Sequence, residues 1–331
     1  MYNFCTLFDS NYFSRGLTLY RSLENVCKNS FHLYIFAFDE IALNVLKQLQ
    51  LKHATIISLQ EFEDEELLKV KPTRNRAEYC WTATSSTILY VIENYSVEMC
   101  TYLDADMFFY SSPKPLFDEM GEKSILITEH RYSPRYNKEA KTGIYCVQFV
   151  SFKNDERGLT ALKWWRDRCI EWCYARFEDG KFGDQKYLDD WTTRFEGVHV
   201  LQHLGGGVAA WNVQQYEFFK KENALYLREK LTGSEFSVVF YHYHYLRFFT
   251  DGLVELGRRV LTENVLENLY APYIQTLVNV QKEIEKIDNS FDANGAAENN
   301  FSWKKLILYI YRKAFGIYNI YPLEKFFPSK L

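Results

Sequence analysis

The chain has 331 residues, of which 47% are hydrophobic and 25% are charged, and its formal net charge is −4. This composition is that of a globular protein and excludes a chain that is disordered or of low complexity throughout. No apolar stretch reaches the roughly 18 uninterrupted residues that a membrane-spanning helix needs. The acidic balance leaves no global basic field to neutralise phosphates, so nucleic acid is not an expected partner.

The seven cysteines are an odd number, and most of them sit inside apolar runs, where a free thiol behaves as a small buried hydrophobe. No Cys/His spacing typical of a structural metal site occurs. The first residues, MYNFCTLFDSNYF, lack the basic and long apolar regions of a signal peptide. These features together predict reduced thiols and a cytoplasmic location.

The first hundred residues alternate between strand and helix patterns. Continuous apolar runs predict strands at 2–8, 31–38 and 54–59, and helical spacing predicts helices at about 41–51 and 77–93. The stretch 99–109 follows, and its residues 100–103 are expected to form one more strand. Buried strands that alternate with helices predict an α/β fold with a mostly parallel sheet covered by helices on both faces.

The middle of the chain is less regular. Strands are expected at 124–129 and 144–152, and an amphipathic helix at 158–177. A hairpin is expected around Thr232-Gly233-Ser234, followed by a helix between 262 and 287 that is kinked or restarted at Pro272.

The sharpest chemical signal is Asp104-Ala105-Asp106, which follows an apolar strand directly. Ligands of open α/β sheets bind at the carboxyl ends of strands. Paired carboxylates suit Mg²⁺ or Mn²⁺, which keep coordination positions open for phosphate oxygens. The alternative is a solvated turn after a strand.

A second candidate set is Tyr241-His242-Tyr243-His244, with Arg247 three residues later. Histidines two residues apart share one face of a strand, so both His242 and His244 could bind one ion. Arg247 offers a bidentate fork for phosphate. The alternative is a pair of partly exposed strand histidines without a ligand.

Two weaker sets remain. Asp184-Gln185 follows Gly183, and Asp184 could equally be a helix N-cap. Three glycines, 205–207, precede Trp211-Asn212, and they permit either close approach to a ligand or a plain loop.

In this order the motifs resemble those of GT-A glycosyltransferases, and most closely the glycogenin-like and lipopolysaccharide galactosyltransferase-like enzymes of family 8. The resemblance covers about residues 1–250 and rests on FDSNY, EYCWTATSSTILYVIENY, LDADMFFYSSPKPLF, GDQKYLDDW, GGGVAAWN and FYHYHYLRF. It implies a GT-A, Rossmann-like nucleotide-diphospho-sugar transferase fold with a C-terminal helical extension.

The resemblance also implies roles for individual residues. The end of the first strand would hold the nucleobase through Thr6, Phe8, Asp9 and Tyr12. Asp104 and Asp106 would bind the metal that bridges the nucleotide diphosphate, and Asp184 and Gln185 would lie beside the transferred sugar.

The late part of the family pattern, HxxGxxKPW, is not reproduced. The sequence has two histidines there and no KPW, so His242 is favoured as the metal ligand, with His244 close behind. Arg247 is expected to replace the family's lysine at the phosphates.

These features predict a Mn²⁺- or Mg²⁺-dependent glycosyltransferase that moves a hexose-type sugar, with retention of configuration. The donor is expected to be a nucleotide sugar, with UDP favoured, and the acceptor a glycan or lipid-linked oligosaccharide of bacterial-type surface polysaccharide synthesis. If the enzyme inverts instead, Asp184, Asp189 and Asp190 are the candidate bases. One alternative is a phosphatase of the haloacid dehalogenase type, although Phe108 occupies a position where that family wants Thr or Val. Another is a non-catalytic GT-A-like module that binds sugar or nucleotide.

Four regions are expected: a GT-A catalytic domain at 1–250, a helical part at 251–288, a polar linker at 289–300 and a basic aromatic tail at 301–331. From Ser302 onward the tail has six basic residues against one acid, and its apolar residues cluster on one side of a helical wheel. Basic amphipathic helices lie in membrane interfaces, so the tail is expected to hold the protein peripherally on the inner face of the membrane. The alternative is a C-terminal helix docked on the body or on another subunit.

Overall fold

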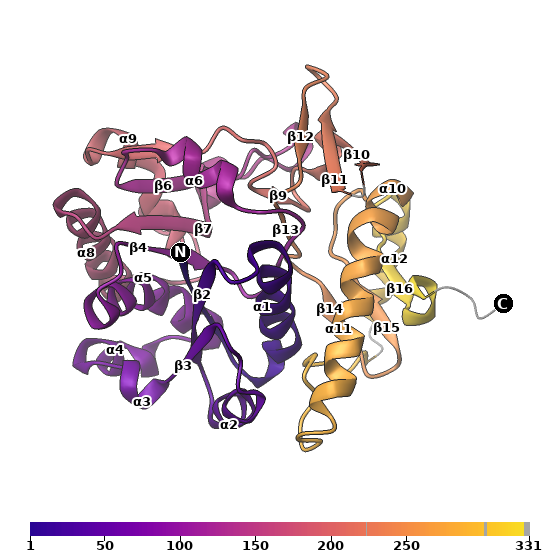
Figure 1. Cartoon of the computed structure of the whole chain (residues 1–331). Helices are drawn as coiled ribbons and strands as arrows, with labels where there is room; N and C mark the ends of the chain where they lie inside the picture. The colour runs from indigo at the N-terminus through magenta and orange to yellow at the C-terminus, as the bar shows by residue number, and fades with distance from the viewer. Residues whose placement is uncertain (223, 301–302, 328–331) are drawn as a thin grey trace.

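The computed structural model describes residues 1–222, 224–300 and 303–327, with the side chains of 303–305 left out. Its centre is a seven-stranded sheet with the order β3-β2-β1-β4-β7-β6-β8 (Figure 1). β7 is antiparallel to both of its neighbours, and the other strand pairs are parallel. The strands are β1 (Tyr2–Phe8), β2 (Phe31–Ala37), β3 (Ala54–Ser58), β4 (Met99–Leu103), β6 (Ile125–Glu129), β7 (Tyr145–Lys153) and β8 (Val198–Val200). The predicted α/β fold with a mostly parallel sheet is confirmed.

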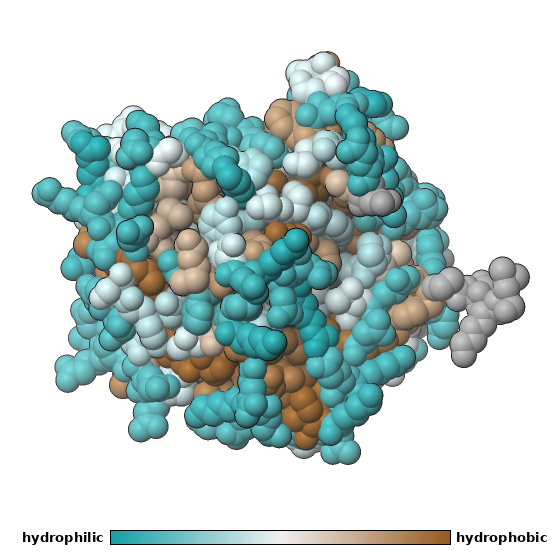
Figure 2. Space-filling model, in the orientation of Figure 1, coloured by the Kyte–Doolittle hydropathy of each residue, from teal (hydrophilic) through white to brown (hydrophobic). Residues whose placement is uncertain are grey.

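Helices cover both faces of this sheet because alternate strand residues point to opposite sides. Phe4 and Phe8 of β1 enter one core with α1 (Phe13–Cys27) and α2 (Glu40–Leu49). Cys5 and Leu7 enter the opposite core with α5 (Arg76–Tyr95) and α8 (Glu156–Glu171). The shorter helices are α3 (Leu59–Phe62), α4 (Glu65–Val70), α6 (Lys114–Met120), α7 (Glu139–Thr142) and α9 (Trp191–Arg194). Figure 2 shows that on one face of the molecule hydrophilic residues surround and partly cover the apolar ones.

The stretch at 99–109 forms β4 and then β5 (Met107–Phe109), because a turn at 104–106 separates them and β5 pairs in another sheet. One sequence-based prediction needs correction. The helix expected at 158–177 ends at Glu171, where Trp172 adopts an extended backbone.

A second core lies beside the main sheet and contains three smaller sheets, whose orders are β5-β13-β9, β10-β11-β12 and β14-β15-β16. Their strands are β9 (Val208–Ala209), β10 (Tyr216–Lys221), β11 (Ala224–Glu229), β12 (Glu235–Ser237), β13 (Phe240–His242), β14 (Arg247–Phe248), β15 (Leu253–Glu255) and β16 (Ile320–Pro322). The hairpin predicted around Gly233 is formed by β11 and β12. β13 continues the same sequence but pairs with β5 and β9 instead.

The C-terminal part packs against this second core. α10 (Glu263–Val265) leads through a π-helical turn, Leu266–Tyr270, into α11 (Ala271–Ile284), so the helix is irregular just before Pro272, as predicted. In the stretch expected to be a linker, Ala293 and Asn294 are buried, and the Ser14 backbone N–H donates to the Ala293 carbonyl at 2.9 Å.

The last helix, α12 (Trp303–Ala314), is followed by β16, which pairs with β15. Among the described residues, no helix has the length and apolar character needed to cross a membrane.

Candidate functional site

Asp104 and Asp106 lie in the turn that carries the chain from the main sheet into the second core. Asp104 follows β4, and its backbone N–H donates to the Gln148 carbonyl at 3.2 Å. The Met107 N–H donates back to the Asp104 carbonyl at 3.2 Å and closes the turn. The predicted position of the motif, at the carboxyl end of a buried strand, is therefore observed.

The pairing of β5 with β13 brings the two histidines to this turn. Met107 lies opposite His242, and the Tyr243 N–H donates to the Asp106 carbonyl at 2.9 Å. His242 Nε2 is 3.0 Å from Asp106 Oδ1 and 3.6 Å from Asp104 Oδ2. Asp106, His242 and His244 each offer one ligand atom, and these atoms all lie within 4.8 Å of one another. We call these three residues the metal group.

The charges in this group are strongly coupled. Burial opposes a charge on His242, but Asp106 raises the pKa of its imidazole well above the ordinary value. Burial also opposes the charge of Asp106, yet His242 lowers the pKa of that carboxyl to about 2. Burial raises the pKa of Asp104 to about 6, against the effect of His242. Burial and the charge of His242 lower the pKa of His244 to about 3, so His244 is neutral at pH 7.

Two residues hold the histidines in place: Gln148, which sequence reasoning missed, and Trp211, from the candidate set after the glycine run. Gln148 Oε1 lies 2.7 Å from His242 Nδ1, which leaves Nε2 of the same ring toward Asp106. Trp211 packs edge-on against His242 and His244, with ring centroids 5.4 and 5.7 Å apart. A glutamine inside the largely apolar strand at 144–152 was an available signal, because buried polar side chains are rare without a partner.

The metal group fits a divalent cation such as Mn²⁺. It combines a carboxylate with two imidazoles, which are acceptable ligands for Mn²⁺ when oxygen ligands accompany them. One imidazole is oriented from behind by Gln148, as metal-binding histidines usually are. Asp104 lies outside the group itself but close enough to His242 to share its surroundings.

Metal binding is expected to release a proton from His242. Because Asp106 raises the pKa of His242, the imidazole is protonated at pH 7 and a metal must displace that proton. Mn²⁺ affinity should therefore rise with pH between 6 and 8, by roughly tenfold per unit for each proton displaced. Calorimetric titrations of Mn²⁺ in two buffers of different ionisation enthalpy would measure the release. An affinity that is constant over this pH range would contradict it.

The residues predicted to hold the nucleobase lie in two environments. Thr6 and Phe8 are buried in β1, and Phe8 packs on α1 so closely that a Cβ added at Gly16 would lie 2.2 Å from its ring. Asp9 follows β1 and accepts from the backbone N–H groups of Asn11 and Tyr12 at 2.9 and 3.2 Å.

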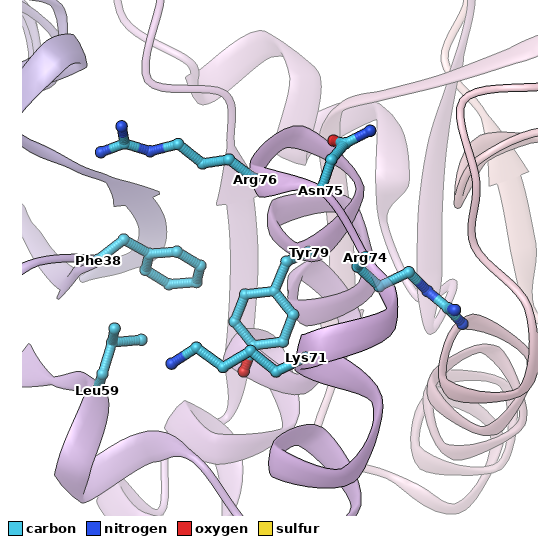
Figure 3. A pocket seen from close by; sticks show the side chains of 7 residues that line it. All are labelled: Phe38, Leu59, Lys71, Arg74, Asn75, Arg76 and Tyr79. Atoms are coloured by element: carbon cyan, nitrogen blue, oxygen red, sulfur yellow. The ribbon is translucent and has the colours of Figure 1, made fainter.

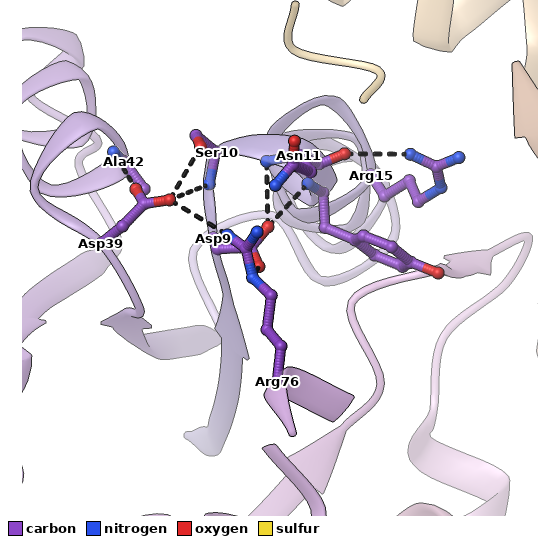
Figure 4. A network of polar contacts seen from close by, with 8 residues as sticks. Asp9, Ser10, Asn11, Arg15, Asp39, Ala42 and Arg76 are labelled. Carbon is purple, nitrogen blue, oxygen red and sulfur yellow. Dashed lines mark hydrogen bonds and ion pairs between the residues drawn. The ribbon is translucent and has the colours of Figure 1, made fainter. Parts of the chain in front are cut away.

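Asp9 belongs to a polar network at the ends of β1 and β2 (Figure 4). Arg76 at the start of α5 forms ion pairs with both Asp9 and Asp39. Asp39 accepts from the Ser10 hydroxyl at 2.7 Å and from the Ala42 N–H at 2.8 Å. Burial raises the pKa of Asp9, and Arg76 opposes that rise.

Tyr12, Arg15 and Arg247 form the side of this region that faces the second core. Tyr12 is 43% exposed, and the Arg15 guanidinium lies over its ring at 4.5 Å. Arg15 is buried and donates only to carbonyls, those of Asn294 and Leu246 at 3.0 Å and Asn11 at 3.5 Å. Arg247 is exposed on β14. Arg15 was not singled out from the sequence.

A small hollow of about 220 Å³ adjoins the same network. In Figure 3 the rings of Phe38 and Tyr79 face it, while the guanidinium of Arg74 points away. The hollow is lined by Phe38, Leu59, Lys71, Arg74, Asn75, Arg76 and Tyr79.

Asp184 lies close enough to the turn at 104–106 for the charge of Asp104 to act on it, and Gln185 follows it in the chain. Asp184 is buried, and its burial together with the charge of Asp104 raises its pKa to about 8. Its carbonyl accepts from Trp165 Nε1 at 2.9 Å, and its side chain makes no N-cap hydrogen bond. Gln185 Nε2 donates to the Thr142 carbonyl at 2.5 Å.

The glycine run has a packing role. A Cβ at Gly205 would lie 1.9 Å from the Ser237 carbonyl oxygen, and one at Gly206 would meet Leu201 and Leu116. Gly207 has a φ of +104°, which only glycine adopts readily. The close approach at these glycines is made by other parts of the protein, and approach to a ligand stays a prediction.

No family model matches the chain. Among solved structures, it is similar to an active-site mutant of LgtC, with a TM-score of 0.45, 13% identity, and 73% of this chain and 87% of the other covered. It is also similar to mouse xyloside xylosyltransferase 1 in the apo form, with a TM-score of 0.45, 14% identity, and 74% and 98% covered. The galactosyltransferase LgtC in complex with donor and acceptor sugar analogs aligns with a TM-score of 0.37, 14% identity, and 60% and 72% covered. These are similarities to GT-A glycosyltransferases, and any function of this chain has to be argued from its own residues.

Two bacterial proteins are related to the chain over almost their whole length. The uncharacterized protein YfnD of Bacillus subtilis (strain 168) is 31% identical over 296 residues, which are 88% of this chain and 92% of YfnD. The uncharacterized protein YfnF of the same strain is 30% identical over 305 residues, which are 90% of this chain and 98% of YfnF. The chain therefore belongs to the same family as YfnD and YfnF.

Proposed function

We propose that the chain is a metal-dependent glycosyltransferase of the GT-A type that moves a hexose from a nucleotide sugar to a glycan or lipid-linked acceptor. The observation that carries the proposal is the metal group, in which Asp106 from the end of β4 meets His242 and His244 from β13 and the residues after it. This group lies at the carboxyl end of β4, the edge at which ligands of open α/β sheets bind.

The donor is proposed to lie between the metal group and the end of β1. Asp9 and Tyr12 face the nucleobase in this arrangement, and the cations Arg15 and Arg247 lie beside Tyr12 for the diphosphate. A bound Mn²⁺ or Mg²⁺ would supply a Lewis acid for the departing diphosphate. Arg15 is held by carbonyls and has no carboxylate partner among the described residues, so its charge is free to act on phosphate.

Retention of configuration is the favoured outcome. An inverting enzyme needs an ionised base beside the acceptor hydroxyl. Burial and Asp104 keep Asp184 mostly protonated at pH 7, since its pKa is about 8. Asp189 forms an ion pair with Lys186 at 2.6 Å, and Asp190 forms one with Arg194 at 2.5 Å. Both carboxylates therefore already have a cationic partner.

The phosphatase alternative is less consistent with the site. A haloacid dehalogenase places its two aspartates after the first strand, whereas Asp104 follows β4 and Asp106 groups with two histidines. A non-catalytic module would share the metal and nucleotide sites but show no turnover of any donor.

The first test is a calorimetric titration of UDP into the protein with and without Mn²⁺. We expect tight binding only with the metal, because the metal group would hold the diphosphate through the ion. If UDP does not bind, GDP, CMP and dTDP are titrated in the same way. Absence of metal-dependent binding for every nucleotide would overturn the proposed function.

The tail is proposed to attach the protein to the inner face of the membrane. The exposed apolar residues of α12 and the turn after it recur at helical spacing, with Ile307 69% and Ile310 60% exposed, and include Tyr311 and Phe315. Lys304 and Lys305 add positive charge at the start of this segment, and Lys313 near its end. Anionic lipid attracts such residues.

Point substitutions test this attachment better than truncation, because β16 and Phe326 at the end of the chain belong to the folded body. Ile307→Ser with Ile310→Ser should weaken binding to phosphatidylglycerol vesicles by roughly 30-fold or more, since two apolar side chains no longer enter the interface. Leu231→Ser is the control, because Leu231 is 91% exposed on a hairpin far along the sequence from α12. Equal co-sedimentation of the double variant and the wild type would rule out attachment through α12.

A further inference from the structure

A group of positive charges lies beside the metal group without acidic partners. The loop between β6 and β7 carries Arg135, Lys138 and Lys141, and Arg259 lies on the segment after β15. Tyr136 joins the two segments, because the Arg259 guanidinium lies over its ring at 4.7 Å and its hydroxyl accepts from the Val260 N–H at 2.9 Å.

Both segments are fixed to the residues that surround the histidines. The Ser133 N–H donates to the Trp211 carbonyl at 3.0 Å, and Trp211 packs on His242 and His244. Gln214 Nε2 donates to the Val260 carbonyl at 3.0 Å. The positive charges are therefore held on the side of the metal group next to β6, whereas the proposed nucleotide residues lie on the side next to β1.

These charges are not neutralised within the described part of the chain. No carboxylate there lies within 4.0 Å of the side-chain nitrogens of Lys138, Lys141 or Arg259, whereas neighbouring Lys186 pairs with Asp189 at 2.6 Å. Arg259 Nε is buried and has no hydrogen-bond partner. The loop contains one acid, Glu139.

The electrostatic consequences agree with this geometry. Burial lowers the pKa of Lys138, and the charges of Arg259 and Lys141 lower it further. The positive charge of Arg259 also adds to the burial that lowers the pKa of His244. Like charges repel one another, and a bound anion would relieve that repulsion.

We propose that Lys138, Lys141 and Arg259 form a subsite for a phosphate group carried by the acceptor. The inference rests on the proposed function, because the metal group and nucleotide residues would hold the donor phosphates on the opposite side. The guanidinium of Arg259 supplies a planar fork for phosphate oxygens, and the two lysines add flexible point charges.

The position of α12 indicates how such an acceptor would arrive. Arg135, in the same loop, donates to the Phe315 carbonyl at 3.1 Å, just after α12. The loop that carries Lys138 and Lys141 therefore meets the chain just after α12, at the exposed Phe315. A sugar attached through phosphate to a membrane lipid could place its phosphate on the subsite while its lipid stays in the membrane.

The test uses the full chain saturated with UDP and Mn²⁺, so that donor phosphate contacts are already occupied. α-D-Glucose 1-phosphate is titrated by calorimetry as a soluble phosphate probe, with glucose as the uncharged control. We expect binding of the phosphate only, and a loss of roughly tenfold in affinity for each of Arg259→Gln and Lys138→Gln with Lys141→Gln. Arg259→Lys should keep most of the affinity, and Lys69→Gln, an exposed lysine on α4, should change nothing.

A second arm separates soluble from lipid-borne phosphate. Vesicles of phosphatidylcholine with and without phosphatidic acid, which presents a phosphate monoester, are compared for the same variants. If the variants bind both glucose 1-phosphate and the phosphatidic acid vesicles more weakly than the wild type, the subsite is assigned to lipid-linked phosphate. If they bind only glucose 1-phosphate more weakly, it is assigned to soluble acceptors. Equal binding of glucose 1-phosphate to the wild type and to a variant that combines Arg259→Gln, Lys138→Gln and Lys141→Gln would overturn the subsite. If UDP and Mn²⁺ bind normally in that case, the proposed function stands without it.

Discussion

Asp106→Asn is expected to abolish metal-dependent nucleotide binding and to lower glycosyl transfer by roughly 10³-fold or more, while the chain still folds. Asn keeps the shape of Asp but lacks the charge that pairs with His242 at 3.0 Å and would bind the ion. A metal that stabilises a leaving diphosphate contributes several kcal/mol to catalysis, which corresponds to this range of rates. Calorimetry with UDP and Mn²⁺, and donor turnover, measure the two effects.

The matched control is Asp118→Asn, which removes an exposed carboxylate that pairs with Lys114 on α6. Its nucleotide affinity should equal that of the wild type. Asp106→Asn should also lose the stability that comes from the raised pKa of His242. That contribution is complete below about pH 6.5 and disappears as the pH rises through the raised pKa of His242. The pair also needs an ionised Asp106, whose pKa is lowered to about 2, so the contribution falls again below about pH 4. The variant should therefore be most destabilised between about pH 4 and 6.5. Equal UDP affinity of variant and wild type with Mn²⁺ would rule out the metal role of Asp106.

The strands of the main sheet could be predicted because each is a continuous apolar run buried on both faces. β1 matches its predicted range, and β2 and β3 end one residue earlier than predicted. The break at 104–106 could not be predicted from hydrophobicity, because apolar residues continue on both sides of it. Where β4 ends is decided by β5, which leaves the sheet to pair with a strand more than 130 residues later.

The candidate site was predictable in its parts but not in its geometry. The sequence separates Asp106 from His242, and only the register of Met107 opposite His242 places them together. The same register brings both histidines into the metal group, so both stay predicted metal ligands. Gln148 and Arg15 were missed because their roles come from contacts made across the fold, with His242 in one case and with the Asn294 and Leu246 carbonyls in the other.

The burial of one residue in the tail could not be predicted from its charge pattern. A helical wheel places Arg312 on the polar side of a basic helix, away from its apolar residues, yet the structure buries it. Its guanidinium lies 2.8 Å from Glu255 of β15, and both side chains are nearly inaccessible. Charge periodicity alone cannot distinguish a solvated cation from one that pairs with a distant acid.

Arg312→Leu is therefore expected to destabilise the protein by about 3 kcal/mol, because it leaves the buried Glu255 carboxylate without its partner. The remaining cation, Arg258, is 4.0 Å from Glu255 and mostly exposed, so it compensates little. The free energy of unfolding from urea denaturation measures this loss. Lys313→Leu is the neighbouring control, and since Lys313 is exposed, it should stay within about 0.5 kcal/mol of the wild type.

A double-mutant cycle shows whether the pair itself is responsible. Glu255→Leu alone leaves Arg312 buried and unpaired, and the double variant removes both charges from the interior. The double variant should therefore be more stable than the sum of the single losses predicts, by about 1 kcal/mol or more. Additive losses would mean that Arg312 acts through packing alone. A stability of Arg312→Leu equal to that of the wild type would mean that α12 does not dock on β15 in solution, and the arrangement of the subsite beside Phe315 would then also fail.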